Sequence, residues 1–388
     1  MSVAGAPGRR RLHPAVRLCA LQLALVLLLG IGELAARWLA VPPPTLLRLP
    51  DPELWVATAD GDIGLRPCWS GTSSAVAGAS VLVTTNSLGM RDREFAGKAA
   101  GERRLLLLGD EGVFGAGVPA EHALPTQLQQ ALADRGEAWT VGNGGVPRYG
   151  SRHAAQQFER LDAAFAPDAV VWCGNLGDDT RDDQEPERTV YAGHLLRGPQ
   201  VAAVQASWRA RLACRSALAR WIERAWAGDD GPFASLPEAL PELGERTFAG
   251  LFLDVGDGDP AWQGRPPERA RWLEPLRASL RTMRERADRR PLWFVVVPTR
   301  WQLGEGERQE ALRRLGFRPL DCPRGAGQQR WLAVAAELGV AAVDATPALA
   351  AEPDPAALFT ADGLLMSARG HAALARWLAG ALADVLPR

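Results

Sequence analysis

The chain has 388 residues, of which 47% are hydrophobic and 23% are charged, a composition typical of a globular protein with one large or two modest cores. Its 44 Lys and Arg residues nearly balance 45 Asp and Glu residues, and the formal net charge is −1 at pH 7. The composition therefore argues against a disordered chain, and the charge balance argues against nucleic acid as a partner.

The N-terminal part combines a basic segment with an apolar one. The arginines of residues 1–17 are Arg9, Arg10, Arg11 and Arg17. Residues 18–41 are largely apolar and uncharged apart from Glu33 and Arg37, and they reach the length of about 20 residues that a helix needs to cross a bilayer. Because positive flanks stay in the cytoplasm, we predict a basic cytoplasmic N-terminus over 1–17 and a transmembrane signal anchor over 18–41. The main domain is then periplasmic or extracellular.

A cleaved signal peptide is the alternative, since the strictly uncharged part, residues 18–32, is short. No clear Ala-x-Ala cleavage site follows it, and Pro42-Pro43-Pro44 is typical of a stiff linker. The pattern favours a single-pass membrane protein whose first partner is the lipid bilayer. Residues 42–100 hold turn formers and short β runs such as 79–85, and are predicted to form a linker and a lead-in β segment.

From residue 101 to residue 388, predicted strands alternate with predicted helices. The strands are expected at 103–108, 138–141, 169–172, 292–297 and 340–343. The helices are expected at 123–133, 152–165, 272–287, 328–338 and 367–385. This alternation predicts an α/β fold of three layers, α/β/α, around a mainly parallel sheet. Residues 184–268 break the pattern and are predicted to be a helical and loop insertion.

The predicted insertion contains an amphipathic helix, expected over 206–226, and an apolar stripe at helical spacing. The stripe consists of Val204, Trp208, Leu212, Leu218, Trp221 and Ile222. Such stripes usually pack against a core, so packing on the main sheet is favoured, and a surface for a partner is the alternative.

A pair of carboxylates follows the first strand of the alternating part. The apolar strand over 103–108 leads into Gly109-Asp110-Glu111-Gly112. Reactive groups of open α/β sheets lie at the carboxyl ends of strands, so Asp110 and Glu111 are expected to face the cleft.

Six segments, in order and on the expected elements, carry a family resemblance. They are Asn86–Gly89, Gly109–Glu111, Gly117–Pro119, Asn143–Gly150, Val297–Gln302 and Asp362–His371. Over roughly residues 80–388 the chain resembles the SGNH (GDSL-type) hydrolases, in particular their membrane-anchored subgroup. The resemblance implies a flavodoxin-like α/β/α fold and a site built, in that family, around a Ser-His-Asp triad.

The resemblance assigns five positions to catalytic roles, and three of them hold side chains that cannot perform the role. Glu111 stands at the position of the nucleophilic serine and Leu365 at that of the basic histidine, whereas Asp362 retains the orienting acid. Gly145 matches the glycine that supplies an oxyanion donor. Asp178 stands where the family has an asparagine, and a carboxylate cannot donate to an oxyanion.

The resemblance therefore implies a pseudoenzyme that has kept the fold and serves a binding or accessory role at the cell envelope. Members of the subgroup are associated with acetylation or deacetylation of envelope polysaccharides, which implies such a polysaccharide or a membrane-bound acyltransferase as partner. The candidate ligand-binding residues are Asp110, Glu111, Gly145, Asn175, Asp178, Arg300 and Asp362. The sequence has no metal-ligand spacing among its cysteines and histidines, and neither a metal nor a cofactor is predicted.

Two alternatives retain an enzymatic activity. In the first, Glu111, Asp178 and Asp362 converge in one cleft, where they share a proton or bind a cation as a metal-assisted hydrolase. In the second, an active esterase or O-acetyltransferase uses an unrecognised nucleophile. The hydroxyl residues near the relevant loops are Thr180, Thr360 and Ser367. Ser367 is also expected to cap the last helix, and His371 to be a satisfied structural histidine.

Overall fold

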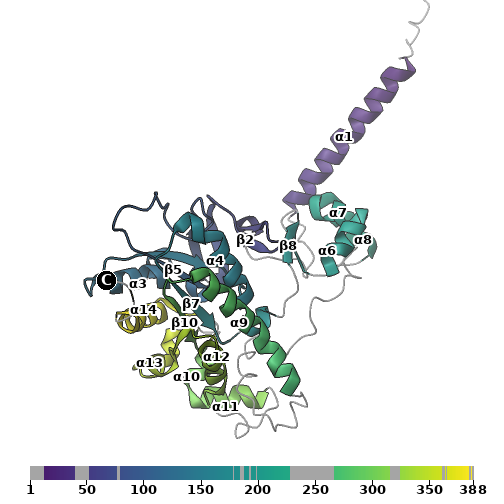
Figure 1. Cartoon of the computed structure of the whole chain (residues 1–388). Helices are drawn as coiled ribbons and strands as arrows, with labels where there is room; N and C mark the ends of the chain where they lie inside the picture. The colour runs from purple at the N-terminus through teal and green to yellow at the C-terminus, as the bar shows by residue number, and fades with distance from the viewer. Residues whose placement is uncertain are drawn as a thin grey trace, which may run out of the picture. The chain divides into compact units, whose positions relative to one another are not determined.

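The computed structural model describes residues 13–39, 52–76, 79–177, 179–183, 188–191, 194–197, 199–227, 266–314, 324–360, 363, 365–383 and 386. The chain divides into two compact units. The first comprises Met1–Leu49 and Tyr191–Pro237, and the second comprises Pro50–Val190 and Glu238–Arg388. Figure 1 labels many of the helices and strands of both units.

The first unit contains a long apolar helix, α1 (Pro14–Trp38). His13 caps its start, because the His13 Nδ1 atom accepts a hydrogen bond from the Ala15 N–H at 3.4 Å. The length and composition of α1 suit a membrane span, and equally a signal sequence. The other described elements of the unit are β9 (His194–Arg197), α6 (Pro199–Ala206), α7 (Trp208–Arg215) and α8 (Ala217–Ala227).

The single helix predicted over 206–226 is wrong, because the structure has two helices, α7 and α8, in its place. The Ser207 hydroxyl accepts a hydrogen bond from the Ala210 N–H at 3.2 Å, and the Ser216 hydroxyl accepts one from the Ala219 N–H at 3.0 Å. A serine that caps a new helix offers the backbone an alternative to continuing the old one. The chain therefore changes direction at both serines.

The apolar stripe of this region is mostly exposed, so the preference for packing on the main sheet is wrong for most of its members. Within the first unit, Val204 is buried and Leu218 is partly buried. The exposed members are Trp208, Leu212, Trp221 and Ile222. The small core of the unit joins Val204, a member of the stripe, to Leu196, Ala210, Ala213 and Cys214, which are not members of it.

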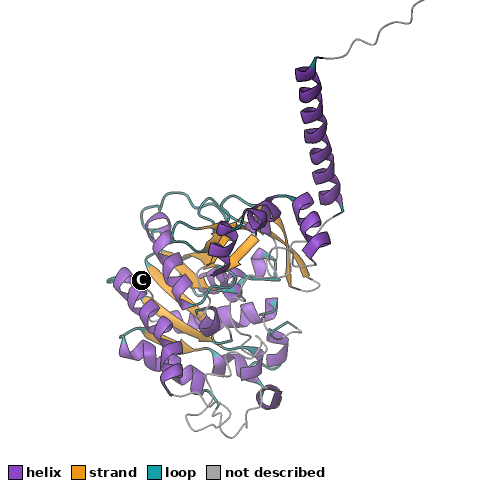
Figure 2. Ribbon diagram, turned by 90° about the vertical axis from the view of Figure 1, so that its right-hand side faces the viewer, coloured by secondary structure: helices purple, strands orange, loops and turns teal. Residues whose placement is uncertain are grey.

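The second unit is built around a five-stranded parallel sheet (Figure 2). Its strands are β5 (Arg104–Gly109), β6 (Thr140–Gly145), β7 (Ala169–Asn175), β10 (Leu292–Val297) and β11 (Ala341–Asp344). They lie in the order β11-β10-β7-β5-β6. This is the flavodoxin-like order, in which the second strand lies outside the first and the later strands extend the other edge. The predicted α/β fold with a parallel sheet is confirmed.

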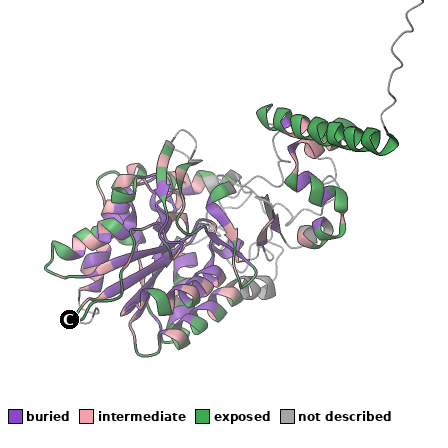
Figure 3. Cartoon of the chain, turned by 90° about the horizontal axis from the view of Figure 1, so that it is seen from above, coloured by how far each residue is buried: buried purple, intermediate pink, exposed green. Residues whose placement is uncertain are grey.

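Helices cover both faces of this sheet, and alternate residues of each strand enter different cores. One core joins Leu105, Leu107, Val171 and Val295 to α3 (Leu124–Ala133) and α14 (Ala368–Leu382). The other joins Leu106, Leu108, Val170 and Phe294 to α4 (Ser151–Phe165), α9 (Pro266–Ala287) and α12 (Ala326–Glu337). Figure 3 shows the strands as the buried middle layer. Polar groups at this sheet can therefore gather only at the ends of the strands.

The segment before the sheet contributes two β-hairpins. Strand β1 (Trp55–Ala57) pairs with β2 (Ile63–Leu65), and β3 (Ser70–Val76) pairs with β4 (Ala79–Thr84), both antiparallel. The buried Arg91 follows them and donates hydrogen bonds to the carbonyl oxygens of Phe114 (3.0 Å) and Val118 (2.8 Å). Because these carbonyls follow β5, Arg91 connects the lead-in segment to the carboxyl edge of the sheet.

Short elements complete the second unit. They are η2 (Pro52–Leu54), α2 (Glu111–Phe114), η3 (Ala120–His122), α5 (Asp179–Asp182), β8 (Arg188–Tyr191), α10 (Arg300–Leu303), α11 (Glu305–Arg314), α13 (Thr346–Ala350) and η8 (Pro355–Leu358). The Ser367 hydroxyl accepts a hydrogen bond from the Gly370 N–H at 3.2 Å, so the structure confirms that Ser367 caps the last helix, α14.

Candidate functional site

The strand order places a topological switch point between β5 and β7. The chain proceeds from β5 to β6 on one side, and then to β7 on the other side of β5. In open α/β sheets the crevice outside the carboxyl ends of two such strands is where ligands bind. The residues at this position are Asp110 and Glu111 after β5 and Asn175 at the end of β7. The sequence predicted all three as ligand-binding candidates, and the structure brings Asp110 and Asn175 into contact.

A hydrogen-bond cluster joins the two strand ends. The Asn175 Nδ2 atom donates to Asp110 Oδ2 at 2.8 Å, and Asp110 Oδ1 accepts from the Gly112 N–H at 2.8 Å. The Asn175 Oδ1 atom accepts from the Gly177 N–H at 2.9 Å, and the Asn175 N–H donates to Asp179 Oδ2 at 2.9 Å. Both functional groups of the Asn175 side chain are thus held by this chain itself.

Glu111 begins the short helix α2 directly beside this cluster. The residue as a whole is partly buried, but its Oε2 atom is buried and has no hydrogen-bond partner in the structure. Burial raises the pKa of the Glu111 carboxyl well above its usual range, and the neighbouring Asp110 carboxyl raises this pKa further. Burial likewise raises the pKa of Asp110, against the hydrogen bond from Asn175. The pair therefore retains protons at pH values where exposed carboxyls are ionised.

Gly145 closes the site from the end of β6. Its N–H donates a hydrogen bond to Asn143 Oδ1 at 3.1 Å. A Cβ atom at position 145 would lie 2.3 Å from the Phe114 backbone nitrogen, so only glycine allows α2 to approach the strand this closely. The amide that the family resemblance assigns to an oxyanion is engaged in this internal hydrogen bond.

Of the remaining predicted positions, some lie outside the described residues, and the others have their described contacts with other partners than the Asp110 cluster. The positions outside the described residues are Asp178 and Asp362. Leu365 is partly buried and closes a backbone turn with Thr360, whose N–H donates to the Leu365 carbonyl at 2.8 Å. Arg300 follows β10 as predicted, but its guanidinium forms an ion pair with Glu307 at 2.6 Å. Its charge is therefore already compensated locally.

His371 has a different environment from the one expected. The side chain is buried, as a structural histidine is, yet neither ring nitrogen has a hydrogen-bond partner in the structure. Burial lowers the pKa of His371 to about 4, and the charge of Arg91 contributes to the decrease. The ring is therefore neutral at neutral pH, and the expectation of a satisfied histidine is wrong.

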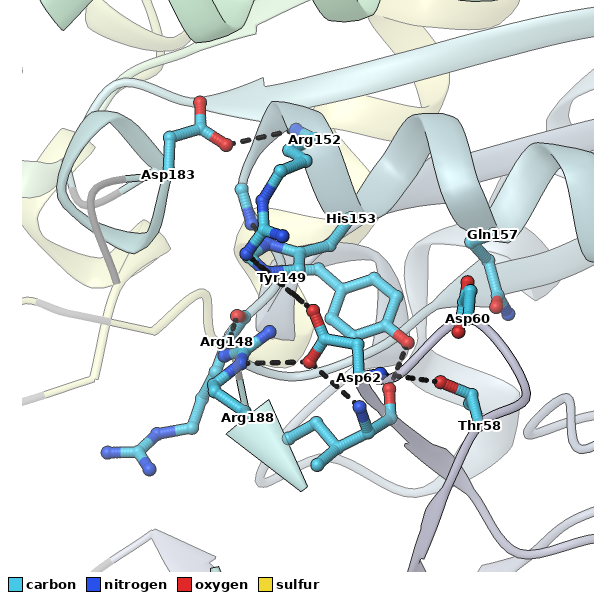
Figure 4. Close-up of polar contacts among 12 residues, drawn as sticks. Thr58, Asp60, Asp62, Arg148, Tyr149, Arg152, His153, Gln157, Asp183 and Arg188 are labelled. Carbon is cyan, nitrogen blue, oxygen red and sulfur yellow. Dashed lines mark hydrogen bonds and ion pairs between the residues drawn. The ribbon is translucent and has the colours of Figure 1, made fainter. Parts of the chain in front are cut away.

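A second polar cluster, which sequence reasoning missed, lies around Asp62 (Figure 4). The His153 Nε2 atom is 3.0 Å from Asp62 Oδ2, and the Arg188 Nε atom donates to Asp62 Oδ1 at 3.1 Å. The His153 Nδ1 atom accepts from the Gly150 N–H at 3.0 Å, which fixes the start of α4. Arg188 also donates to the Arg148 carbonyl at 2.8 Å. No sequence signal joins these residues, since Asp62 and Arg188 are 126 positions apart.

The charges of this second cluster compensate one another in the interior. Burial alone would raise the pKa of Asp62, but the hydrogen bond with His153 and the charge of Arg188 hold it below the usual range. Burial lowers the pKa of His153 to about 4. At neutral pH the cluster thus contains an ionised Asp62, a neutral His153 and a cationic Arg188, all buried. This arrangement is structural, because the committed side chains leave His153 no free acceptor for a substrate proton.

Comparisons with known proteins give structural likenesses only. No family model and no curated protein matches the chain. A lipase/acylhydrolase from Enterococcus faecalis is 14% identical with a TM-score of 0.38, over 74% of this chain and 97% of that one. A lipolytic protein of the G-D-S-L family from Desulfitobacterium hafniense is 11% identical with a TM-score of 0.35, over 72% and 99%. An acetyl xylan esterase from Geobacillus stearothermophilus is 17% identical with a TM-score of 0.37, over 74% and 97%.

These solved structures are lipases and esterases, the class that the sequence motifs also resemble. At such low identities and TM-scores the likeness carries no inference about the activity of this chain. The assignment to the α/β class rests on the strand order and the two helix layers of the second unit.

Replacing Glu111 by Gln is expected to flatten the pH dependence of stability. A raised pKa means that the folded chain binds more protons than the unfolded chain between the ordinary glutamate pKa, about 4.3, and the raised value. The free energy of unfolding therefore falls as pH rises through this window, by about 1.4 kcal/mol per pH unit at most. Glu111→Gln has no proton to lose there. Urea unfolding of the full chain in detergent, followed across this pH range, measures the difference.

The matched control for this prediction is Glu53→Gln, which changes an exposed glutamate of the same unit. Its unfolding free energy is expected to follow the wild-type curve at every pH. If the Glu111→Gln curve ran parallel to both, the raised pKa of Glu111 would be contradicted.

Replacing Asp62 by Ala is expected to lower the free energy of unfolding by about 3–5 kcal/mol, since it leaves the buried Arg188 without its carboxylate. Asp60→Ala removes a carboxylate two residues away that pairs with the partly exposed Arg160. The Asp60→Ala control is expected to lower the free energy of unfolding by about 1 kcal/mol or less. Chemical denaturation of both variants measures the difference. Equal decreases in the free energy of unfolding would show that the Asp62 cluster stabilises the fold no more than the Asp60–Arg160 pair does.

Proposed function

We propose that this chain is a membrane-anchored protein of the cell envelope that has lost ester-hydrolase activity and serves a binding or accessory role in polysaccharide acylation. The proposal is based on which side chains lie at the switch point between β5 and β7. Glu111 and Asp110 occupy it as a buried pair of carboxyls with raised pKa values, in place of a nucleophile beside a base.

The groups required for acyl transfer are missing or engaged at this position. Acyl transfer needs a nucleophile within hydrogen-bond reach of a base, and donors aimed at the oxyanion. The Gly145 N–H is donated to Asn143, and the Asn175 side-chain amide is donated to Asp110. Loss of one triad member already leaves only residual catalysis, and here the positions of both nucleophile and base hold other residues.

The hydroxyls that were considered as unrecognised nucleophiles have structural uses where their contacts are described. The Ser367 hydroxyl donates to the Ala357 carbonyl at 2.7 Å while it caps α14. The Thr360 hydroxyl donates to the Leu365 carbonyl at 3.1 Å. These contacts favour a role in the turn before α14 over a role in catalysis, so they support the loss of esterase activity.

The carboxyl pair suits the binding of a polyhydroxyl ligand. A protonated carboxyl donates one hydrogen bond and accepts others, whereas an ionised carboxylate only accepts. With the pKa values of Asp110 and Glu111 both raised, the site can both donate to a sugar hydroxyl and accept from one. The buried Glu111 Oε2 atom, which has no partner in the structure, is the group for which a ligand would supply the missing hydrogen bond.

The first unit supports a retained anchor over a cleaved signal peptide. The Glu33 carboxylate, in the last turns of α1, accepts hydrogen bonds from the Ser216 hydroxyl at 2.7 Å and from the N–H groups of Ala217 and Leu218, each at 3.0 Å. A leader that is removed after export has no reason to cap a helix of the mature protein. We therefore propose that α1 stays attached and crosses the bilayer, with the N-terminus in the cytoplasm.

The loss of activity predicts that the full chain in non-ionic detergent does not hydrolyse p-nitrophenyl acetate above the buffer background. Glu111→Ala and Asp362→Ala are expected to give the same background rate, with or without a chelator. A measurable rate that Glu111→Ala abolishes would contradict the proposal, and its dependence on metal would then favour the carboxylate-cluster hydrolase over an unrecognised nucleophile.

The binding role is tested in the same preparation. Cell-envelope polysaccharide is expected to raise the melting temperature of the full chain, because a ligand that binds only the folded state stabilises it. The rise is expected to be smaller for Glu111→Ala and unchanged for Glu53→Ala. An equal rise in all three would place the binding elsewhere.

The topology predicts that Cys68 reacts with a membrane-impermeant maleimide in cells whose cytoplasmic membrane is intact. Cys68 is exposed and unpaired in the second unit, and Cys173 and Cys214 are buried. The difference in labelling between the wild-type chain and Cys68→Ser isolates this thiol. Labelling that appears only after the cytoplasmic membrane is opened would place the second unit in the cytoplasm.

A further inference from the structure

The helix α8 of the first unit has one apolar face and one polar face. At 100° per residue, one arc of the helix holds the apolar residues Leu218, Trp221, Ile222, Ala225 and Trp226. The charged residues of α8 lie on the opposite arc. The apolar side chains are large and reach solvent, with exposed fractions of 51% for Trp221, 47% for Ile222 and 89% for Trp226. Exposed apolar surface of this kind usually marks a site that contacts another protein or a membrane.

The same apolar face touches the membrane-span candidate α1. A Cβ atom placed on Gly32 of α1 would lie 3.0 Å from Leu218 Cδ2, so the two helices are in close contact at these residues. One residue further along α1, the Glu33 carboxylate caps the start of α8 through Ala217 and Leu218. The face that carries Trp221 and Ile222 is therefore continuous with the surface of α1.

The position of this contact along α1 matches the edge of a bilayer. The uncharged part of α1 ends at Gly32, and Glu33 and Arg37 then form an i,i+4 ion pair at 2.8 Å. That uncharged part, residues 18–32, is about 22 Å long at 1.5 Å per residue. With residues 14–17, whose Arg17 side chain is long enough to extend toward headgroups, Gly32 lies about 27 Å along α1, close to the roughly 30 Å thickness of the hydrocarbon core. The start of α8 thus falls where hydrocarbon gives way to headgroups.

Charge selects the kind of surface that α8 and its neighbours would meet. Residues 199–227 contain five arginines and one acidic residue. The arginines are Arg209, Arg211, Arg215, Arg220 and Arg224, and the acidic residue, Glu223, pairs with Arg209 at 2.6 Å. Arg220 and Arg224 belong to α8, where Arg220 also donates to the Ala213 carbonyl at 2.9 Å, and the other three arginines belong to α7. Tryptophans on one face of a helix, with arginines on its other face and on the neighbouring helix, are typical of segments that lie in the headgroup region of anionic membranes.

We propose that α8 lies in the interface of the bilayer that α1 enters, with Trp221, Ile222 and Trp226 in the headgroup and acyl boundary and the arginines toward anionic headgroups. The inference rests on the proposed function in one respect, the membrane insertion of α1. It adds a second lipid contact, one that ties the first unit to the membrane surface. The occupant of the apolar face is thus lipid, because the face continues from a surface that lipid already covers.

The test uses single cysteines labelled with the environment-sensitive fluorophore NBD in the full chain, reconstituted in vesicles of phosphatidylcholine and phosphatidylglycerol. The thiols replaced by alanine beforehand are Cys19, Cys68 and Cys322. The buried Cys173 and Cys214 are kept, because burial raises the pKa of each thiol and suppresses its labelling. Labels are placed by Ile222→Cys on the apolar face, by Arg224→Cys on the polar face, and by Leu25→Cys in the middle of α1.

The expected result is a blue-shifted emission at 222, protected from iodide quenching, beside an unshifted and quenched emission at 224. Both positions are exposed in the structure, so the difference reports the face and not burial in the protein. Equal emission at 222 and 224, whether shifted or unshifted, would overturn the proposal. So would a shift at 222 that persists in lipid-free detergent and depends on the protein concentration, which would identify a second protein chain as occupant.

The label at 25 separates this proposal from the anchor on which it rests. A blue-shifted label at 25 with a quenched label at 222 means that α1 is inserted and α8 is not docked, so only the further inference fails. A quenched label at 25 means that the anchor itself fails. Vesicles of phosphatidylcholine alone provide the charge comparison, and the shift at 222 is expected to be smaller there.

Discussion

The burial of both faces of the parallel sheet is the constraint on which the rest of the second unit depends. Each strand sends alternate residues into two separate cores, so the middle of the sheet has no room for polar chemistry. Polar side chains can gather only where strands end, and the flavodoxin-like order opens one favoured place for them, between β5 and β7. The short helix α2, held against β6 by Gly145, completes that place.

The second unit has two buried polar clusters, and the pKa values of their carboxyls shift in opposite directions. Around Asp62, a cation and an imidazole compensate one carboxylate, and the pKa of Asp62 is held low. Around Asp110 and Glu111, two carboxyls lie together with the Asn175 amide, and burial raises the pKa values of both. The first cluster stabilises the fold. The second is the kind of environment that gathers at functional sites, which is why we propose that it binds a ligand with hydroxyl groups.

The first unit depends on a single carboxylate in a comparable way. A carboxylate such as Glu33 would be costly near the hydrocarbon of a bilayer. Glu33 caps α8 and pairs with Arg37, so the same contacts satisfy the Glu33 carboxylate and order the helix beside α1. The small residue Gly32 allows Leu218 to approach α1 closely. The combination makes α1 a part of the folded protein as well as a segment of suitable length to cross a membrane.

The sequence by itself determined what depends on local pattern. The alternation of apolar strands with helices predicted the parallel α/β fold, the position of Asp110 and Glu111 after an apolar strand predicted their place at a strand end, and Ser367 was recognisable as a cap because capping is a contact between near neighbours. The sequence predicted one long helix over 206–226, whereas the Ser207 and Ser216 hydroxyls accept from backbone N–H groups and begin two separate helices there. Only the tertiary structure decided which distant residues meet. The contacts of Asp62 with Arg188, of Asn175 with Asp110 and of Glu33 with Ser216 join positions 126, 65 and 183 residues apart. Their partners, and hence their pKa values, follow from strand order and helix packing, which no local periodicity encodes.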